Sequence, residues 1–104
     1  MKRIHRGETI PIPFTFRDQV TRQPVAADNG YPKITIWNPD GTICHDGSDV
    51  AINAVTMSAG TAGAGSYVYV FKCPADHAAG AYRILVEAHQ GSYIEKEESA
   101  IEVI

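Results

Sequence analysis

Apolar residues alternate with polar or small ones in two long runs, and a Pro-to-Gly corner at residues 74–80 separates the runs. The residues that share one face are large or β-branched in most positions: Tyr67, Tyr69 and Phe71 in the first run, and Tyr82, Ile84, Val86 and Ala88 in the second. A period of two is that of a β-strand with one buried face. The pattern therefore predicts two half-buried strands, over residues 66–73 and 81–88, at the centre of the fold.

A third run, residues 8–17, alternates equally well but contains prolines. Its apolar face carries Ile10, Ile12, Phe14 and Phe16, and its other face carries Pro11, Pro13 and Thr15. Proline has no N–H to donate to a neighbouring strand, so proline in a strand indicates a sheet edge. We expect this strand at an edge, with both proline nitrogens turned away from its neighbour.

Shorter strands are predicted over residues 33–37, 42–46, 50–57 and 93–104, the last with a bulge near residues 95–98. Turns are predicted at 38–41, 46–49 and 90–92, a long loop at 18–31 and a flexible loop at 58–65, because these stretches are rich in Pro, Asp, Asn, Ser or Gly. Asp76 would cap one helical turn over residues 76–79. The fold class is all-β, a two-sheet antiparallel β-sandwich of about seven strands.

The 104 residues fit one domain, with a flexible amino-terminal tail at 1–7 and a sandwich at 8–104. A content of 44% hydrophobic and 20% charged residues is that of a globular chain rather than a disordered one. No signal peptide or apolar run of about 20 residues is visible. We expect a complete product made in the cytoplasm without a signal, and the competing interpretation is a fragment that begins at an added Met.

The net charge of −3 argues against a nucleic-acid partner, because a protein that binds nucleic acid is expected to have a basic face. The basic residues Lys2, Arg3 and Arg6 are interpreted as a solvated tail. No membrane partner is expected.

Cofactors and metals are not expected. None of His5, His45, His77 and His89 has zinc-ligand spacing to another histidine or to a Cys-x-x-Cys pair. Asp40, Asp46 and Asp49 lack the alternating acidic pattern of a calcium loop, and their Asp-Gly contexts favour turn formation. Cys44 and Cys73 are interpreted as reduced core or edge residues.

No catalytic residues are predicted, because no nucleophile lies at a strained elbow or helix start and a small sandwich offers little concavity. Among the aromatic residues, Trp37 lies on the opposite face of its strand from Ile34 and Ile36. It is therefore the aromatic side chain most expected at the surface.

Tyr82 follows Gly80 at the start of a strand, in the position of a tyrosine corner. Its hydroxyl would then bond to the backbone a few residues upstream, near Ala78. Asp76, Gly80 and Tyr82 are the predicted structural corner.

Three segments, residues 7–9, 36–42 and 74–84, resemble the run G-E-T … I-x-x-P-D-G-T … P-A-D-x-x-x-G-x-Y-x-V of bacterial and bacteriophage immunoglobulin-like domains, including macroglobulin-type ones. Ile84 replaces the final Val, the Gly/Ala tract at 58–65 is longer than usual, and no inter-sheet Cys pair is present. The resemblance covers residues 7–103. Its motifs are turn and corner residues, which specify a fold more than a function.

The resemblance to stand-alone phage domains implies a non-enzymatic virion protein, namely a capsid decoration, head–tail or tail component that docks on other virion proteins. It is also compatible with an oligomer of this chain in the assembled particle. The interface would use Ile10, Pro11, Ile12 and Pro13 together with the tail, by strand addition, and Trp37. One alternative is a carbohydrate- or host-surface-binding module that uses Trp37 with the loops at 18–32 and 58–65. Another is a macroglobulin-like domain excised from a larger chain.

Overall fold

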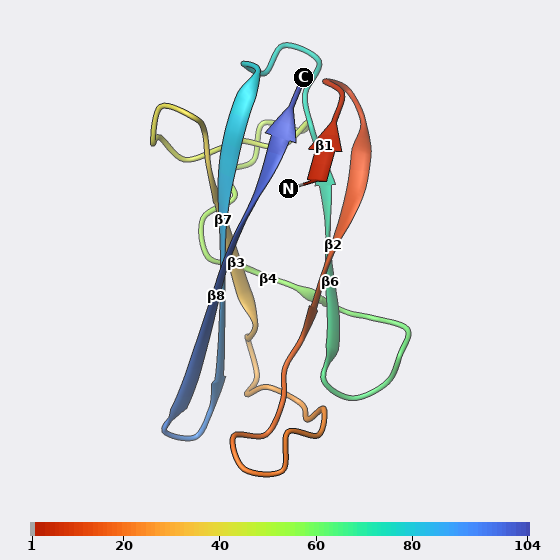
Figure 1. Ribbon diagram of the computed structural model, residues 1–104, viewed down its shortest axis with the longest axis vertical. Coiled ribbons are helices and arrows are strands. Elements are labelled where there is room, and N and C mark those ends of the chain that lie inside the picture. Colours follow the sequence, from red (N-terminus) through yellow and green to blue (C-terminus); the bar gives the residue numbers. More distant parts are fainter. Residues whose placement is uncertain (1) are drawn as a thin grey trace.

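The computed structural model describes residues 2–104, which form eight strands in two sheets and no helix (Figure 1). The five-stranded sheet has the order β1 (Lys2–Ile4), β8 (Tyr93–Val103), β7 (Gly80–Gln90), β3 (Lys33–Trp37) and β4 (Val55–Thr56). The three-stranded sheet has the order β2 (Thr9–Thr15), β6 (Ser66–Lys72) and β5 (Ser58–Ala59). Neighbouring strands are antiparallel except β1 and β8. The predicted all-β two-sheet sandwich is confirmed, with eight strands instead of about seven.

The core lies between the two sheets and is built from the alternating positions of the long strands. The side chains that are almost fully buried include Phe16, Ile34, Ile36, Phe71, Tyr82, Ile84 and Val103. Burying an aliphatic or aromatic side chain of this size contributes about 1.5–3 kcal/mol. The period-two pattern of the sequence therefore marks the residues that hold the sheets together.

β2 lies at the edge of its sheet, as its prolines predict. Phe16 N donates to Gly65 O and Cys73 N donates to Glu8 O, so the even-numbered residues of this strand direct their backbone groups toward β6. The odd-numbered residues, among them Pro11 and Pro13, direct theirs away from it. The missing proline N–H groups therefore cost this sheet no hydrogen bond.

The predicted flexible tail is wrong for residues 2–4, while Met1 lies outside the described residues. Lys2–Ile4 form β1 and pair in parallel with Ile101–Val103 of β8. The Ile4 side chain is 2% exposed in the core. Three residues are too few to show a period of two, and their partner lies at the other end of the chain, so the pattern gave no signal for this strand.

Residues 42–52 do not form the two predicted strands, and β4 is confined to Val55–Thr56. They cross the sandwich edge irregularly: Cys44 N donates to Ile36 O, Ile36 N to Ile52 O, and Ile52 N to Cys44 O. Cys44 and Ile52 are buried anchors, whereas the turn between them is exposed. A left-handed backbone at Asp49 and at Ala54, with φ of 60° and 54°, interrupts extended pairing.

Three smaller predictions are also wrong. Ser58 and Ala59 belong to β5 instead of a loop, and residues 76–79 form no helical turn. The β7–β8 ladder runs without a bulge from Gly80–Val103 to Gln90–Tyr93. The alternation slips at Glu95, Glu97 and Ser99 because these inward positions stay exposed or half-exposed, which indicates that the second sheet does not cover them.

The molecule is elongated, with extents of 42 × 25 × 24 Å. Figure 1 shows the loops of residues 38–54 and 73–79 at the upper end, together with β1 and the chain's carboxyl end. The loops of residues 16–32 and 60–65 and the β7–β8 turn lie at the lower end. The two sets of loops therefore form two separate surfaces.

Candidate functional site

The predicted tyrosine corner is present at the upper end. The Tyr82 hydroxyl donates to Ala78 O at 2.7 Å, and the residue is 1% exposed. Burial raises the pKa of Tyr82 to about 12. Gly80 has a φ of +141°, and a Cβ there would lie 3.0 Å from Pro39 Cγ, so a side chain at this position would be strained and crowded.

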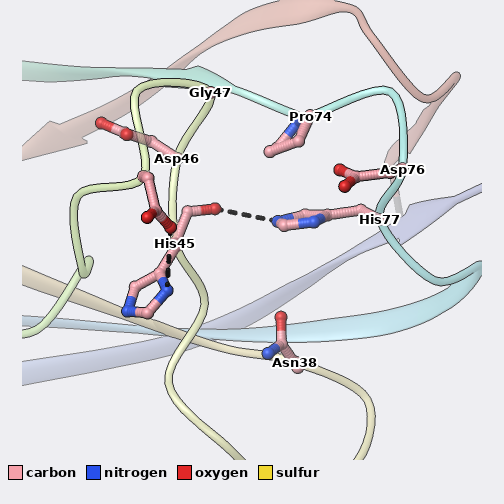
Figure 2. A pocket seen from close by; sticks show the side chains of 8 residues that line it. Asn38, His45, Asp46, Gly47, Pro74, Asp76 and His77 are labelled. Atoms are coloured by element: carbon pink, nitrogen blue, oxygen red, sulfur yellow. Dashed lines mark hydrogen bonds and ion pairs between the residues drawn. The ribbon is translucent and has the colours of Figure 1, made fainter.

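Beside this corner lies an open pocket of about 370 Å³, shown in Figure 2. Its lining comes from two loops that are distant in sequence: Asn38, His45, Asp46, Gly47 and Asp49 from one, and Pro74, Asp76 and His77 from the other. A second hollow of about 230 Å³ lies on the other side of Asp76 and His77, with Pro39, Asp40 and Tyr82 in its wall. Asp76 is thus an exposed wall residue, and it caps no helical turn.

His77 joins the two loops across the pocket. Its Nε2 lies 2.9 Å from His45 O and 3.3 Å from Cys44 Sγ, and its ring stacks on Tyr82 with centroids 5.7 Å apart. A carbonyl oxygen only accepts, so the Nε2–H donates to His45 O. His77 therefore fastens the loop of residues 45–49 to the corner (Figure 2).

Cys44 Sγ lies 3.3 Å from His77 Nε2, a contact that sequence reasoning missed because 33 positions separate the two residues. Because this nitrogen carries the hydrogen that is donated to His45 O, it cannot also act as a base toward the thiol. The Cys44 side chain is buried, and burial raises its pKa to about 12. The raised pKa keeps this thiol protonated at neutral pH, whereas the reactive form of cysteine is the thiolate. Cys73 is also free and buried, and burial raises its pKa as well.

The aspartates of the loops stabilise turns, as predicted from their sequence contexts. Asp40 Oδ1 accepts hydrogen bonds from Thr42 Oγ1 at 2.6 Å and Thr42 N at 3.0 Å, and these bonds lower its pKa. Asp46 Oδ1 accepts from Ser48 N at 2.8 Å and from Val50 N at 3.0 Å. Within residues 2–104, no group of three or more His, Cys, Asp or Glu side chains has the geometry to hold a metal ion.

The predicted interface residues divide between core and surface. Ile10 and Ile12 are only 7% and 9% exposed, so their side chains belong to the core and offer little surface to a partner. Pro11 and Pro13 are exposed on the edge of β2. Trp37 is half-buried, and the Arg83 guanidinium lies 4.4 Å from the centroid of its ring.

Trp37 also does not share a surface with the loops at 18–32 and 58–65. It ends β3 at the upper end of the sandwich, whereas those loops lie at the lower end (Figure 1). The two parts of the contact surface expected for a carbohydrate-binding module therefore lie at opposite ends of the sandwich, and carbohydrate binding stays a prediction.

A feature that the sequence did not predict is the open edge of β8. Arg6 N donates to Ile104 O and Ile104 N donates to Ile4 O, so even-numbered residues at this end of the chain direct their backbone groups toward β1. β1 pairs only with residues 101–103. By the alternation of the ladder, Ile94, Lys96 and Glu98 direct their N–H and C=O groups toward an edge along which no described strand lies.

Acidic side chains surround this edge. Residues 93–99 include three glutamates and one lysine, a net charge of −2. Lys96 Nζ lies 3.6 Å from Glu87 Oε1, so the lysine already has a carboxylate neighbour. The other oxygen of this carboxylate, Glu87 Oε2, lies 2.6 Å from His89 Nε2. Glu95 and Glu97, two positions apart, point to the inner side of the sheet, and Glu98 points to the outer side.

Comparison of the chain with known protein families, with curated proteins and with solved structures gave no match. No helix in residues 2–104 is long and apolar enough to cross a membrane.

Proposed function

We propose that the chain is a non-enzymatic protein-docking module with an immunoglobulin-like sandwich, and that it is an accessory structural protein of a bacteriophage particle. The observation that carries the docking function is the open edge of β8, which presents unpaired backbone donors and acceptors in extended geometry. Strand addition to such an edge is a common mode of peptide and protein recognition.

The strand order supports the immunoglobulin-like assignment. When β2, β3, β5, β6, β7 and β8 are taken as strands B, C, D, E, F and G, the sheets read B-E-D and G-F-C. These are the neighbours found in immunoglobulin sandwiches. The bond from Tyr82 to Ala78 at the start of β7 also fits the tyrosine corner of that fold.

The docking edge differs from the one expected from sequence. β2 lacks outward N–H groups at Pro11 and Pro13, so an added strand there would lose two donors. Residues 2–4 are held in β1 and are not a free tail that wedges into a groove. The partners that we propose are other virion proteins of the capsid, portal or tail, and this particle context rests on the sequence resemblance.

The particle role is tested by mass spectrometry of purified virions of the phage whose genome encodes this chain. We expect the chain in the particles at a fixed copy number relative to the major capsid protein. A chain that is abundant in the lysate and absent from washed particles would contradict the proposal. Proteins of the same genome that are known not to be packaged are the control for carry-over.

A further inference from the structure

We propose that the open edge of β8 binds an extended segment of another polypeptide that carries Lys or Arg at every second position. The segment would lie beside residues 93–99 and add a strand to the five-stranded sheet. This inference rests on the proposed docking function and specifies the chemistry of the partner.

The backbone determines that the ligand is a strand. Ile94, Lys96 and Glu98 offer their N–H and C=O groups at every second residue, which is the spacing that an extended chain satisfies. β1 already pairs with the upper part of the same edge. Figure 1 shows β8 continuing well below β1, so an added strand would lie in line with β1 along the same sheet edge.

The other sheet edges in residues 2–104 are less suited to a partner. β1, β4 and β5 contain three, two and two residues. β2 contains seven residues, but Pro11 and Pro13 remove two of its outward donors. β8 therefore provides the longest edge with a complete set of backbone groups.

The side chains determine that the added strand is basic. Glu95 and Glu97 point to the same side of the sheet and are two positions apart, so an added strand with basic residues at every second position would place them opposite both carboxylates. Glu98 adds a further negative charge on the outer side. The same charges repel acidic strands and discourage apolar ones, which is how natural sheet edges avoid unspecific pairing.

Charge also argues against a second copy of this chain as the partner. Pairing two β8 edges would bring together two segments that each carry a net charge of −2. The only basic residue in the segment, Lys96, already lies beside Glu87. A basic segment of a different protein avoids this repulsion.

The test titrates two blocked heptapeptides into the isotope-labelled full chain: Thr-Lys-Val-Lys-Thr-Lys-Val, and the matched peptide with Glu in place of each Lys. We expect the lysine peptide to shift the amide signals of residues 93–99 and to protect the edge-facing amides of Ile94, Lys96 and Glu98 from hydrogen exchange. Its affinity should exceed that of the glutamate peptide at least tenfold and should fall as salt is added, because exposed charges are screened.

Two variants separate the contributions of backbone and charge. Lys96→Pro removes one edge-facing N–H and should weaken binding of the lysine peptide well beyond the control Lys96→Ala, with the fold of each variant checked by circular dichroism. The double variant Glu95→Lys, Glu97→Lys should reverse the preference so that the glutamate peptide binds more tightly.

Four results would each overturn the inference. Two concern the peptides: neither of them binds, or the signal shifts are confined to the pocket of Asp46, Asp49 and Asp76. The other two are equal affinities of Lys96→Pro and Lys96→Ala for the lysine peptide, and self-association of the chain through β8. If the chain is present in particles but does not bind the lysine peptide, only the claim that the β8 edge binds a basic strand would be disproved. Absence from particles would disprove the particle role whatever the peptide result.

Discussion

Tyr82 shows how one side chain orders a whole corner. Its ring is buried in the core, its hydroxyl bonds to Ala78 O, and its outer face supports His77, which in turn donates to His45 O. The corner and the loop of residues 45–49 are thereby tied to a single anchor in the core.

Replacing Tyr82 with Phe should lower the free energy of unfolding by about 1–2 kcal/mol, because the Ala78 carbonyl loses a partner in a partly buried place. Urea unfolding of the two proteins measures the difference. Tyr93→Phe is the matched control, since the Tyr93 hydroxyl lies 3.4 Å from Glu95 Oε1 at a half-exposed position, and it should change the free energy by less than about 0.5 kcal/mol. Equal effects of the two substitutions would contradict a structural role for the corner bond.

At the scale of elements, β1 links the start of the chain to its end. Lys2–Ile4 pair with Ile101–Val103, and the two neighbours Arg3 and Ile4 face opposite sides. Arg3 Nε lies 2.6 Å from Glu102 Oε1 at the surface, whereas Ile4 is in the core. The two residues therefore test separately the charge and the apolar contributions of this strand.

Ile4→Ala should destabilise the protein by about 2–4 kcal/mol, since it removes buried methylene and methyl groups and leaves a cavity. Arg3→Ala should cost less than about 1 kcal/mol, because an exposed ion pair contributes little. Thermal and urea unfolding of both variants provide the comparison. If Ile4→Ala unfolds at the wild-type denaturant concentration, β1 is not a packed element.

The elements that the sequence predicted well are those whose two faces meet different surroundings. β3 was predicted with the observed bounds, because Ile34 and Ile36 are buried on one face and the other face is only half-buried. β6 was predicted to within one residue, although Phe71 is the only fully buried residue of its apolar face. Residues 42–57 were predicted poorly, since only Cys44, Ile52 and Met57 are anchored and the backbone between them is irregular. The tyrosine corner was predictable because it is a local motif. The contact between Cys44 and His77 was not, because it depends on how two distant loops close.

At the scale of the whole molecule, the core and the side chains packed against it include several ionisable groups that stay neutral at neutral pH. Burial raises the pKa of Cys44, Tyr69 and Tyr82 to about 12, from ordinary values of 9.0, 10.0 and 10.0. In the unfolded chain these groups lose their protons near the ordinary values. The folded state therefore binds these protons more tightly than the unfolded chain does at alkaline pH, and the stability of the sandwich depends on the three groups staying protonated.

The contribution of these three groups to the free energy of unfolding should thus be fully present below about pH 9 and should be lost as the pH rises toward 12. Denaturant unfolding at pH 8, 9.5 and 11, in the presence of a reducing agent, measures the decline. Tyr82→Phe removes one of the three groups, so its decline between pH 9.5 and 11 should be shallower than that of the wild type. A flat profile up to pH 11 would show that these groups reach solvent.

The parallel pairing of β1 with β8 has a mechanical consequence. Tension applied at Lys2 and at Ile104 would draw two parallel strands past each other along their length, so that the hydrogen bonds between them, including Ile104 N to Ile4 O, bear the load together. A ladder sheared in this way resists pulling more than one that is peeled open a single bond at a time. The small strand at the start of the chain thus acts as a clamp on the last strand against forces transmitted along the polypeptide.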